Sequence, residues 1–332
     1  MMSEPLVSVI VPAYNAARWI DETLRSVASQ THRNLDVIIV DDGSTDDTAR
    51  LAQIFVDRDP RFRLVRQENA GVAAARNHGA RLARSDLLSF VDADDLWSVD
   101  KTADQQRTLL AAGPGVGLCY SWYVMIDAES RIFYREPGRV IEGHVLDKLM
   151  VDNFIGNGSA ALVRREAFDA ARGFEPALRN ANAQGCEDIL FYARVAEHYA
   201  FVVAQDHHIG YRQLPDNMSS DLNRMLRSWL MFVDEMAGRH PDKRRLLAQG
   251  LRRYARWLTR RAVHRRRPAT LLSVAMRVAV RNPKLAARLL LIEAPGAVRE
   301  QLAWQRQQQA AADASGIALA DRFTPGQRYP IG

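Results

Sequence analysis

The sequence predicts an α/β protein with a mainly parallel sheet flanked by helices, followed by a C-terminal α-helical extension. Three short apolar runs, Val7–Val11, Asp36–Val40 and Leu87–Val91, have the length and composition of buried strands. The segments between them carry apolar residues at helical spacing, and such alternation favours crossover connections and parallel pairing. Because the runs are almost wholly apolar, both faces of the sheet are expected to be covered.

The elements between the apolar runs follow in order. A helical face begins at Ile20 and extends to Ala28. Ser44, with Asp47 three residues later, resembles a capping box and predicts a helix that continues to about Val56. A short strand is expected at Phe62–Val65, and a third helical face at Val72–Ala83.

The middle of the chain is less regular. Strands are predicted at Val116–Tyr120 and Ala160–Val163, and a short helix at Arg165–Ala170. A further helix, Ile189–His198, is opened by Glu187 and Asp188. From Leu222 the pattern becomes helical and rich in arginine. We therefore expect three parts: residues 1–100, residues 101–221 and a basic helical region at 222–332.

Charge is distributed unevenly along the 332 residues, whose net charge is +6. Residues 222–332 contain 22 basic and 7 acidic side chains, whereas residues 1–221 have a net charge of −9. An arginine-rich amphipathic region could contact an anionic membrane surface, or it could pack on the rest of the protein with a solvated basic face. No recognition motif accompanies the charge, so no nucleic acid is expected as a partner.

Two cysteines, Cys119 and Cys186, form no disulfide framework or metal-type spacing, which fits a reducing compartment. The N-terminus resembles no secretory signal, and no stretch approaches the roughly 18 apolar residues of a membrane span. We expect a cytoplasmic protein that is either soluble or peripheral at the inner face of the cell membrane.

Polar side chains follow each of the three apolar runs. These tails are Pro12-Ala13-Tyr14-Asn15, Asp41-Asp42-Gly43-Ser44 and Asp92-Ala93-Asp94. Open parallel sheets bind ligands just beyond the carboxyl ends of their strands. Asp92 and Asp94 project to the same side of an extended segment, and paired carboxylates are ligands that Mg²⁺ or Mn²⁺ prefers. The three tails therefore predict a nucleotide pocket with a divalent metal ion, although solvated loop acids are the alternative for any one of them.

Other candidates lie further along the chain. Arg76 and Asn77 follow a run of small residues, so Arg76 could approach a phosphate or a base. Asp188 could act as a general base, although the helix dipole alone favours an acid at a helix start. Arg212 could neutralise phosphate, and His208 could bind a metal, with a structural role the alternative for each.

In combination and in this order, these motifs resemble the inverting family 2 glycosyltransferases, which have the GT-A fold. The resemblance covers roughly Val7 to Ser219. Its parts are Val7–Asn15, Val40–Asp46, Asn69–Asn77, Phe90–Asp95, Gly173-Phe174 and Glu187-Asp188.

The resemblance implies a role for each matching residue. The nucleotide-sugar site would contain Pro12, Tyr14, Asn15, Asp41, Asp42, Arg76, Asn77, Asp92, Ala93 and Arg212. Asp92 and Asp94 would hold Mn²⁺ or Mg²⁺, and Asp188 would be the catalytic base with Glu187 beside it. Many members carry a histidine soon after a Tyr-Arg pair, and Tyr211-Arg212 lacks one. A late metal-binding histidine would therefore have to be His207 or His208.

The expected function is metal-dependent, inverting transfer of a hexose from a nucleotide-diphosphate sugar, of UDP or dTDP type, to an acceptor hydroxyl. The acceptor would be a glycan or a lipid-linked saccharide in the synthesis of a cell-surface polysaccharide, a glycolipid or another glycoconjugate. One alternative is a nucleotidyltransferase, which also uses sheet-edge acids and a divalent ion. The other is a catalytically silent protein that binds a nucleotide sugar or serves as a scaffold.

Overall fold

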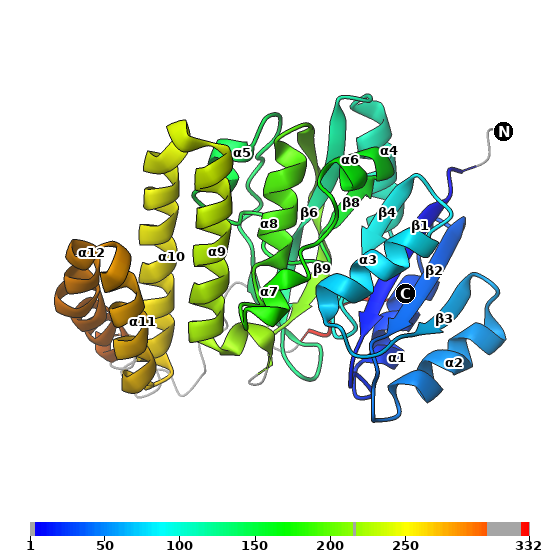
Figure 1. Cartoon of the computed structure of the whole chain (residues 1–332). Helices are drawn as coiled ribbons and strands as arrows, with labels where there is room; N and C mark the ends of the chain where they lie inside the picture. Colours follow the sequence, from blue (N-terminus) through cyan, green and yellow to red (C-terminus); the bar gives the residue numbers. More distant parts are fainter. Residues whose placement is uncertain (1–3, 215–216, 304–326, 332) are drawn as a thin grey trace, which may run out of the picture.

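The computed structural model describes residues 4–214, 217–303 and 327–331 (Figure 1). Nine described strands form one sheet in the order β3-β2-β1-β4-β8-β6-β9-β5, with β7 paired to β6. The strands are β1 Val7–Ala13, β2 Leu35–Asp41, β3 Phe62–Arg66, β4 Leu87–Phe90, β5 Leu96–Trp97, β6 Val116–Ile126, β7 Ile132–Arg135, β8 Ala161–Arg164 and β9 Ala200–Arg212.

The first four strands of this order are parallel, and their carboxyl ends meet at one edge of the sheet. Ala13 at the end of β1 lies opposite Asp41 at the end of β2, and Ile10 lies opposite Phe90 of β4. β1 and β2 are buried along their whole length, as their apolar composition predicts. The three polar tails predicted to converge therefore do so.

Helices connect and cover these strands. Those before residue 200 are α1 Ile20–Ala28, α2 Thr48–Arg58, α3 Val72–Leu82, α4 Lys101–Ala111, α5 Leu146–Leu149, α6 Arg165–Ala170, α7 Ala177–Asn180 and α8 Glu187–Ala196. α3 packs on β1 and β2, and α4 packs against β6, β8 and β9.

The expected capping box at Ser44 is wrong, because α2 begins only at Thr48. The Ser44 hydroxyl instead accepts a hydrogen bond from the Asn15 backbone N–H at 3.0 Å. Asp46 accepts from the Thr48 backbone N–H at 3.0 Å and thereby satisfies a group at the helix start. Ser44 thus ties together two of the polar tails.

The second half of the sheet is mixed. β8 is antiparallel to both β4 and β6, whereas β6 and β9 are parallel. β5 pairs with β9 through Leu96 opposite Gly210, so the segment just after Asp95 lies beside the end of β9. This pairing brings the third polar tail close to Tyr211 and Arg212.

The C-terminal helices are α9 Leu222–Arg239, α10 Arg244–His264, α11 Pro268–Arg281 and α12 Pro283–Arg288, with short 3₁₀ turns at Met218–Ser220 and Pro241–Lys243 and a π-helical turn at Leu289–Glu293. α9 stands beside α8, α10 packs on α9, and α11 and α12 lie farthest from the sheet (Figure 1). Trp229 and Phe232 of α9 and Leu258 of α10 share one buried cluster with Ile189 and Leu190 of α8. None of the described helices is both long and apolar enough to cross a membrane.

Residues 327–331 lie apart from these helices, against the sheet. Tyr329 is buried with Leu96, Val124 and Ile126, and its backbone N–H donates to the Ser130 carbonyl at 2.8 Å. The three-part division of the chain stays a prediction, but residues 222–332 are not all helical and their helices share a core with α8.

Candidate active site

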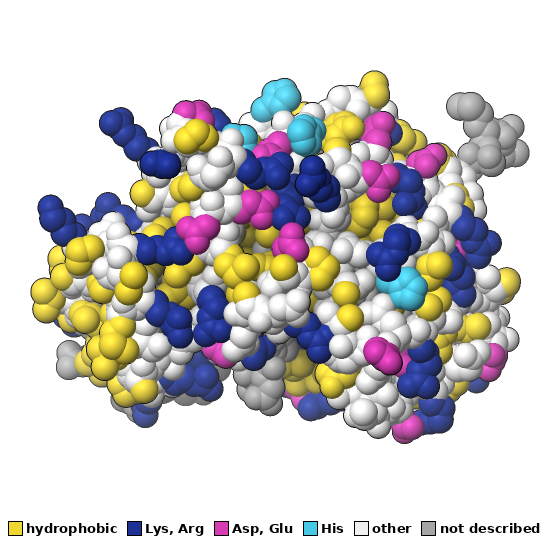
Figure 2. All heavy atoms as spheres, in the orientation of Figure 1, with side chains coloured by type: hydrophobic (Ala, Val, Ile, Leu, Met, Phe, Trp, Pro, Cys, Tyr) yellow, Lys and Arg dark blue, Asp and Glu magenta, His cyan; other side chains and the backbone are white. Residues whose placement is uncertain are grey.

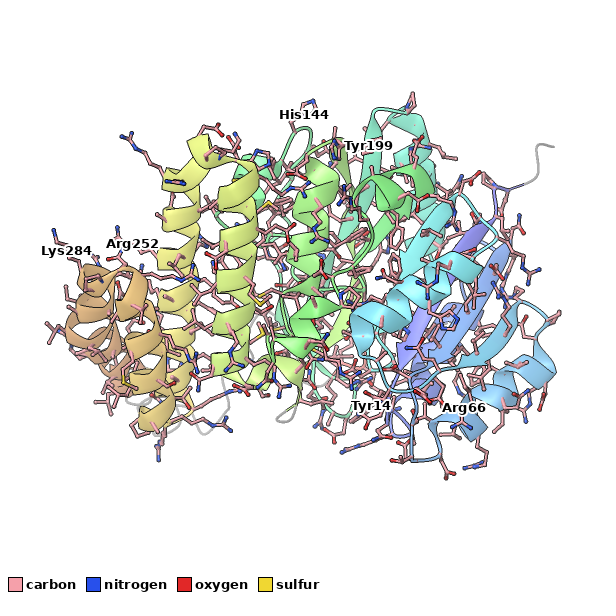
Figure 3. The ribbon with its side chains drawn as sticks, in the orientation of Figure 1. Tyr14, Arg66, His144, Tyr199, Arg252 and Lys284 are labelled. Atoms are coloured by element: carbon pink, nitrogen blue, oxygen red, sulfur yellow. The ribbon has the colours of Figure 1, made fainter. Side chains whose placement is uncertain are left out.

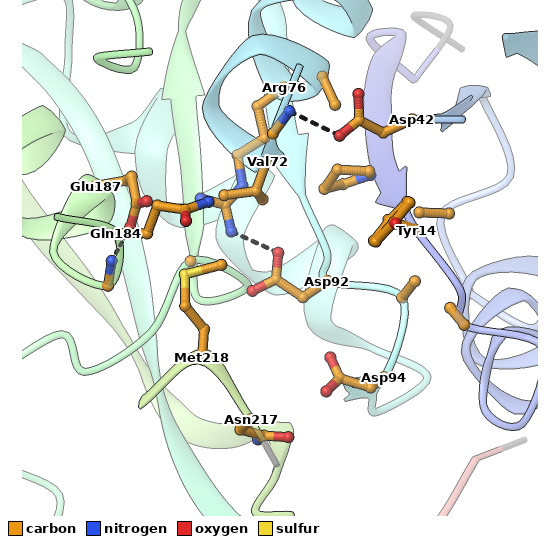
Figure 4. A pocket seen from close by; sticks show the side chains of 18 of the residues that line it. Tyr14, Asp42, Val72, Arg76, Asp92, Asp94, Gln184, Glu187, Asn217 and Met218 are labelled. Atoms are coloured by element: carbon orange, nitrogen blue, oxygen red, sulfur yellow. Dashed lines mark hydrogen bonds and ion pairs between the residues drawn. The ribbon is translucent and has the colours of Figure 1, made fainter. Parts of the chain in front are cut away.

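A cavity of about 690 Å³ lies at the edge where β1, β2 and β4 end (Figure 4). It is lined by Pro12, Ala13, Tyr14, Asn15, Ala16, Trp19, Asp42, Asn69, Gly71, Val72, Ala75, Arg76, Asp92, Ala93, Asp94, Asn157, Gly158, Arg179, Gln184, Gly185, Glu187, Asp188, Tyr211, Leu214, Asn217 and Met218. The cavity thus contains ten of the fourteen residues predicted for the site. We call it the strand-end cavity.

The tail of β1 forms one wall of the strand-end cavity. Tyr14 is 52% exposed, and its ring is available to a ligand. Asn15 has a positive φ of 47°, a conformation in which asparagine is enriched, and its side-chain oxygen accepts from the Thr45 backbone N–H at 2.9 Å. Tyr14 and Arg66 lie at the same edge of the molecule (Figure 3).

Asp41 and Asp42 have different positions, although both were predicted to contact the nucleotide. Asp42 lines the cavity and accepts hydrogen bonds from Gln67 Nε2 and from the backbone N–H groups of Ala70 and Gly71 at 2.7–2.8 Å. The Asp41 prediction is wrong, because its buried carboxylate turns away from the cavity. It accepts from the Ser44 backbone N–H at 3.0 Å and from Arg66 Nε at 2.8 Å.

Arg76 extends from α3 into the back of the cavity and is buried. Its Nη2 donates to Asp92 Oδ1 at 2.5 Å, and its guanidinium lies 4.9 Å from the centre of the Phe174 ring. Burial alone would lower the pKa of Arg76, but Asp92 and then Glu187 raise it. A Cβ at Gly158 would lie only 2.4 Å from Nη2, so glycine leaves the space that the guanidinium occupies.

Asn77, next along α3, does not line the cavity, and the nucleotide contact predicted for it is wrong. Its amide donates to the Phe174 carbonyl at 2.8 Å and accepts from the Phe174 backbone N–H at 2.9 Å. These two bonds satisfy the side chain and join α3 to the segment before α7. Asn77 therefore positions the Phe174 ring against Arg76.

Asp92 and Asp94 both line the cavity, with Ala93 between them. Asp92 is paired with Arg76, whereas no other residue of the described chain donates a hydrogen bond to the Asp94 carboxylate. Burial, followed by repulsion from Asp92, raises the pKa of Asp94 to about 6. The described residues contain no group of three or more His, Cys, Asp or Glu side chains that could hold a metal ion.

Asp95 is buried behind this pair. Its Oδ2 accepts from the Ser159 hydroxyl at 2.6 Å, and its Oδ1 accepts from the Arg212 backbone N–H at 2.9 Å. Burial, together with repulsion from Asp94 and Asp92, raises its pKa well above the usual range. Asp95 thus anchors the loop rather than facing a ligand.

Arg212 is fully buried and does not line the cavity, so the direct nucleotide contact predicted for it is wrong. Its guanidinium donates to the carbonyls of Asp94 at 2.7 Å and Asp127 at 2.9 Å, and to the Glu22 carboxylate at 2.8 Å. It also lies 4.5 Å from the centre of the Trp19 ring. Arg212 therefore holds the backbone of the loop that carries Asp94.

The metal-binding role predicted for His208 is also wrong. The ring is buried outside the strand-end cavity, with Nδ1 2.7 Å from the Ser98 hydroxyl and Nε2 3.3 Å from Asp104. Its pKa is lowered because burial disfavours the imidazolium. His207 projects to the opposite face of β9, where Nε2 lies 2.7 Å from the Glu136 carbonyl. Neither ring therefore lines the cavity beside Asp94.

Glu187 and Asp188, at the start of α8, line the strand-end cavity together with Asp92 and Asp94. Glu187 accepts from the Gly185 backbone N–H at 2.7 Å and lies in the electrostatic field of Arg76. Asp188 Oδ2 accepts from the Asn153 amide at 3.1 Å, and Oδ1 from its own neighbour Ile189 N–H at 2.8 Å. Burial raises the pKa of both carboxyls.

Several lining residues were not predicted from the sequence. They include Trp19, Asn69, Asn157, Arg179, Gln184, Tyr211 and Asn217. Arg179 of α7 donates to the Asn69 side chain and would meet a Cβ at Gly71, where φ is +90°. Gly71, at the start of the run of small residues before Arg76, was the available signal that a side chain packs there.

Comparison with known proteins agrees with this geometry. A model described as "Glycosyl transferase family 2" matches residues 8–171. TuaG of Bacillus subtilis is 44% identical over 108 residues, or 32% of this chain and 43% of TuaG. Its full name is "Putative teichuronic acid biosynthesis glycosyltransferase TuaG". Glycosyltransferase GlyG of Streptococcus pneumoniae is 42% identical over 96 residues, or 29% of this chain and 32% of GlyG. The chain thus spans less than half the length of these curated relatives.

Solved structures show the same fold. The mannosyltransferase PcManGT from Pyrobaculum calidifontis, solved with GDP-Man and Mn²⁺, superposes with a TM-score of 0.60 at 23% identity, over 95% of this chain and 87% of that one. S. aureus TarS 1-349, solved with UDP-GlcNAc, gives a TM-score of 0.59 at 18% identity, over 75% and 72%. The fold is the GT-A type, as predicted. The predicted resemblance to glycosyl transferase family 2 is confirmed over residues 8–171.

Proposed function

We propose that this chain transfers a hexose from a nucleotide-diphosphate sugar to an acceptor hydroxyl, with inversion at the anomeric carbon. The observation that supports this most is the strand-end cavity. It combines an exposed aromatic ring, a buried guanidinium, a pair of carboxylates and a separate carboxylate of raised pKa. The TuaG name supports a place in polysaccharide synthesis, and UDP or dTDP donors are the first to test.

The nucleoside would lie between Tyr14 and Asp42. Three hydrogen bonds already occupy the Asp42 carboxylate, which offers about four acceptor positions, so one remains for a base N–H. Those three bonds also fix the carboxylate against Gly71. Asp42 would therefore recognise the base with little loss of conformational entropy.

The carboxylates of Asp92 and Asp94 fit a divalent metal ion. Both are hard oxygen donors at a strand end. Asp94 lacks a partner from any other described residue, and burial, followed by repulsion from Asp92, raises its pKa. Mn²⁺ or Mg²⁺ bound there would offset the negative charge of the departing diphosphate. PcManGT was solved with Mn²⁺, which supports the same role here. Two protein ligands would leave the remaining positions for donor phosphates and water.

Asp188 would act as the general base. Its carboxylate takes the proton of the acceptor hydroxyl while that oxygen attacks the anomeric carbon and the bond to the diphosphate breaks. Asn153 and the Ile189 N–H hold the carboxylate in place, so it is oriented before the acceptor arrives. Arg76 would stay paired with Asp92 and keep a positive charge between Asp92 and Glu187.

The test is a panel of UDP-, dTDP- and GDP-sugars with Mn²⁺ or Mg²⁺. The expected results are a donor-dependent rise in melting temperature, release of the nucleoside diphosphate and an inverted anomer by NMR. Retention of configuration would overturn the inverting mechanism, and nucleoside diphosphate release undiminished by chelation would overturn the metal's role.

The same panel separates the alternatives. A nucleotidyltransferase would consume a nucleoside triphosphate and release pyrophosphate. A silent binding or scaffold protein would show the melting shift with no turnover of any donor and acceptor. The match to family 2 and the presence of Asp92, Asp94 and Asp188 around one cavity favour the transferase.

We further propose that the C-terminal helices contact the inner face of the cell membrane, where a lipid-linked acceptor would lie. Leu272, Met276 and Val280 follow at intervals of four on α11, and each is more than half exposed. Apolar side chains and arginines mix on this part of the surface (Figure 2). Arg277 and Lys284 make no ion pair with any described residue and remain free for anionic headgroups.

Co-sedimentation with vesicles containing an anionic lipid tests this contact. The Val280→Asp substitution is expected to weaken vesicle binding about tenfold or more. It replaces an apolar side chain that would be buried in the membrane with a negative charge that the anionic headgroups repel. Val140→Asp, at an exposed site on the catalytic part, is the matched control. Equal binding of both variants would refute the contact. Point changes are preferable to deletion, because the helices share a core with α8.

A further inference from the structure

A second cavity, of about 300 Å³, lies between the sheet and the C-terminal helices α9 and α10. We call it the helix cavity. It is lined by Tyr123, Met125, Val151, Asp152, Asn153, Gly156, Gly185, Cys186, Asp188, Ile189, Tyr211, Gln213, Met225, Trp229, Arg253, Tyr254, Trp257 and Arg261. Gly185, Asp188 and Tyr211 also line the strand-end cavity, so the candidate base stands where the two cavities meet.

Aromatic rings form much of the helix cavity. Trp229 of α9 and Tyr254 of α10 are stacked with centroids 4.1 Å apart, and Trp257 follows at 5.5 Å from Tyr254. Trp257 is 40% exposed, so one face is open to a ligand. Rings that combine an apolar face with a polar edge suit the mixed surface of a saccharide.

The Trp229 indole N–H has no hydrogen-bond partner among the described residues, although the side chain is buried. An unpaired buried donor is costly. The Trp229 side chain lines the helix cavity, while its indole nitrogen is closed to solvent.

The charges of the helix cavity leave one cation without a partner. Asp152 is paired with Arg253 at 2.8 Å, and Asp188 is held by Asn153. Arg261 makes no ion pair with any described carboxylate, and its guanidinium lies 5.0 Å from the centre of the Trp257 ring. Arg265, just beyond the end of α10, adds to the positive field, and its side chain donates to the Ser220 carbonyl. A partly buried guanidinium without an anion is a site that recognises one.

We propose that the helix cavity binds the acceptor, and that the acceptor is a saccharide bearing an anionic group, either a phosphate or a carboxylate. The sugar ring would lie against Trp257 and Tyr254, the anionic group would bind Arg261, and the attacking hydroxyl would reach Asp188. This inference rests on the proposed transferase function and names the acceptor class for the same site.

The test is a fluorescence titration of the whole chain with glucuronate, glucose 1-phosphate and neutral glucose. Both anionic sugars, or one of them, are expected to bind about tenfold or more tightly than glucose, since a charge-assisted bond is lost with the neutral sugar. The anionic sugar that binds more tightly shows whether the acceptor carries a phosphate or a carboxylate. Equal binding of all three sugars would overturn the inference.

Variants of α10 locate the effect. Arg261→Gln is expected to abolish the preference for the anionic sugar, and Arg261→Lys to retain part of it. Arg252→Gln is the matched control, because Arg252 is exposed on the same helix and points away from the body of the protein (Figure 3). A preference that survives in Arg261→Gln, or that is lost equally in Arg252→Gln, would overturn the proposal.

Failure of this inference is distinguishable from failure of the proposed function. The melting shift with nucleotide sugars and slow donor hydrolysis without acceptor report the strand-end cavity alone. We expect both in the wild-type protein and, unchanged, in the Arg252→Gln control. If the wild-type protein binds and hydrolyses a donor but does not prefer anionic sugars to glucose, only the acceptor proposal is refuted.

Discussion

Replacing Arg212 should destabilise the protein and displace the loop that carries Asp92 and Asp94, although this side chain does not line the strand-end cavity. Its guanidinium, which is fully buried, satisfies the carbonyls of Asp94 and Asp127 and the carboxylate of Glu22. In Arg212→Gln the Glu22 carboxylate keeps only the Ser130 hydroxyl at 2.7 Å. Breaking a buried pair from one side costs about 3–5 kcal/mol, and because Glu22 is 30% exposed we expect the lower end.

Urea unfolding measures this cost, and Arg131→Gln is the control. Arg131 pairs with the neighbouring Asp127 side chain but is 48% exposed, so its loss should cost at most about 1 kcal/mol. Turnover should fall in Arg212→Gln because the Asp94 backbone loses its support. An Arg212→Gln protein of wild-type stability that fails only in donor binding would refute the reasoning. It would show that Arg212 contacts the donor phosphates directly.

Three further predictions follow from the site. Burial raises the pKa of Asp188 above its usual 3.8, and a protonated base is inactive, so kcat/KM should fall about tenfold per pH unit below that raised value. Asn153→Leu should move this acidic limb of the pH profile to higher pH, because the Asn153 hydrogen bond lowers the Asp188 pKa. A limb that does not move would contradict the Asn153 contact. Because the pKa of Asp94 is about 6, Mn²⁺ would compete with a proton for this carboxylate. Calorimetry should show about tenfold weaker Mn²⁺ binding at pH 5 than at pH 7. An affinity for Mn²⁺ that does not change with pH would argue against Asp94 as a metal ligand. Gly158→Ala should displace the Arg76 guanidinium and lower kcat/KM about tenfold, with Gly296→Ala, where a Cβ meets nothing within 4 Å, as control.

The convergence of the polar tails could be predicted because parallel strands place their carboxyl ends at one edge. Val7–Val11 and Leu87–Val91 needed no long-range information, since an apolar run bounded by polar residues is enough. The same reasoning placed Asp92 and Asp94 in the cavity. Local pattern therefore supplied the donor half of the site.

The wrong predictions concern the direction in which side chains point. Asp41 and Asp42 are adjacent, and only the alternation at the end of β2 decides that Asp42 faces the cavity. His208 faces Ser98 because β9 pairs with β5, a contact between segments more than a hundred residues apart. Asp46, and not Ser44, accepts from the backbone N–H at the start of α2. The Ser44 hydroxyl accepts instead from the backbone N–H of Asn15, which is distant in sequence.

The helix cavity could not be predicted for a similar reason. Its residues come from β6, the start of α8 and the C-terminal helices, which approach each other only in the folded chain. Arg261 was visible in the sequence as one of many arginines. Only the structure shows that Arg253 has a carboxylate partner whereas Arg261, on the same helix, has none among the described residues.

The most direct test of the central claim is sugar transfer by Asp188→Asn, measured beside donor binding by the same protein. The substitution keeps the shape of the side chain and removes the base, so transfer should fall by about 10²- to 10⁴-fold while the donor-dependent melting shift is retained. Asp57→Asn, an exposed carboxylate on α2, is the matched control. Near-wild-type transfer by Asp188→Asn would contradict the account.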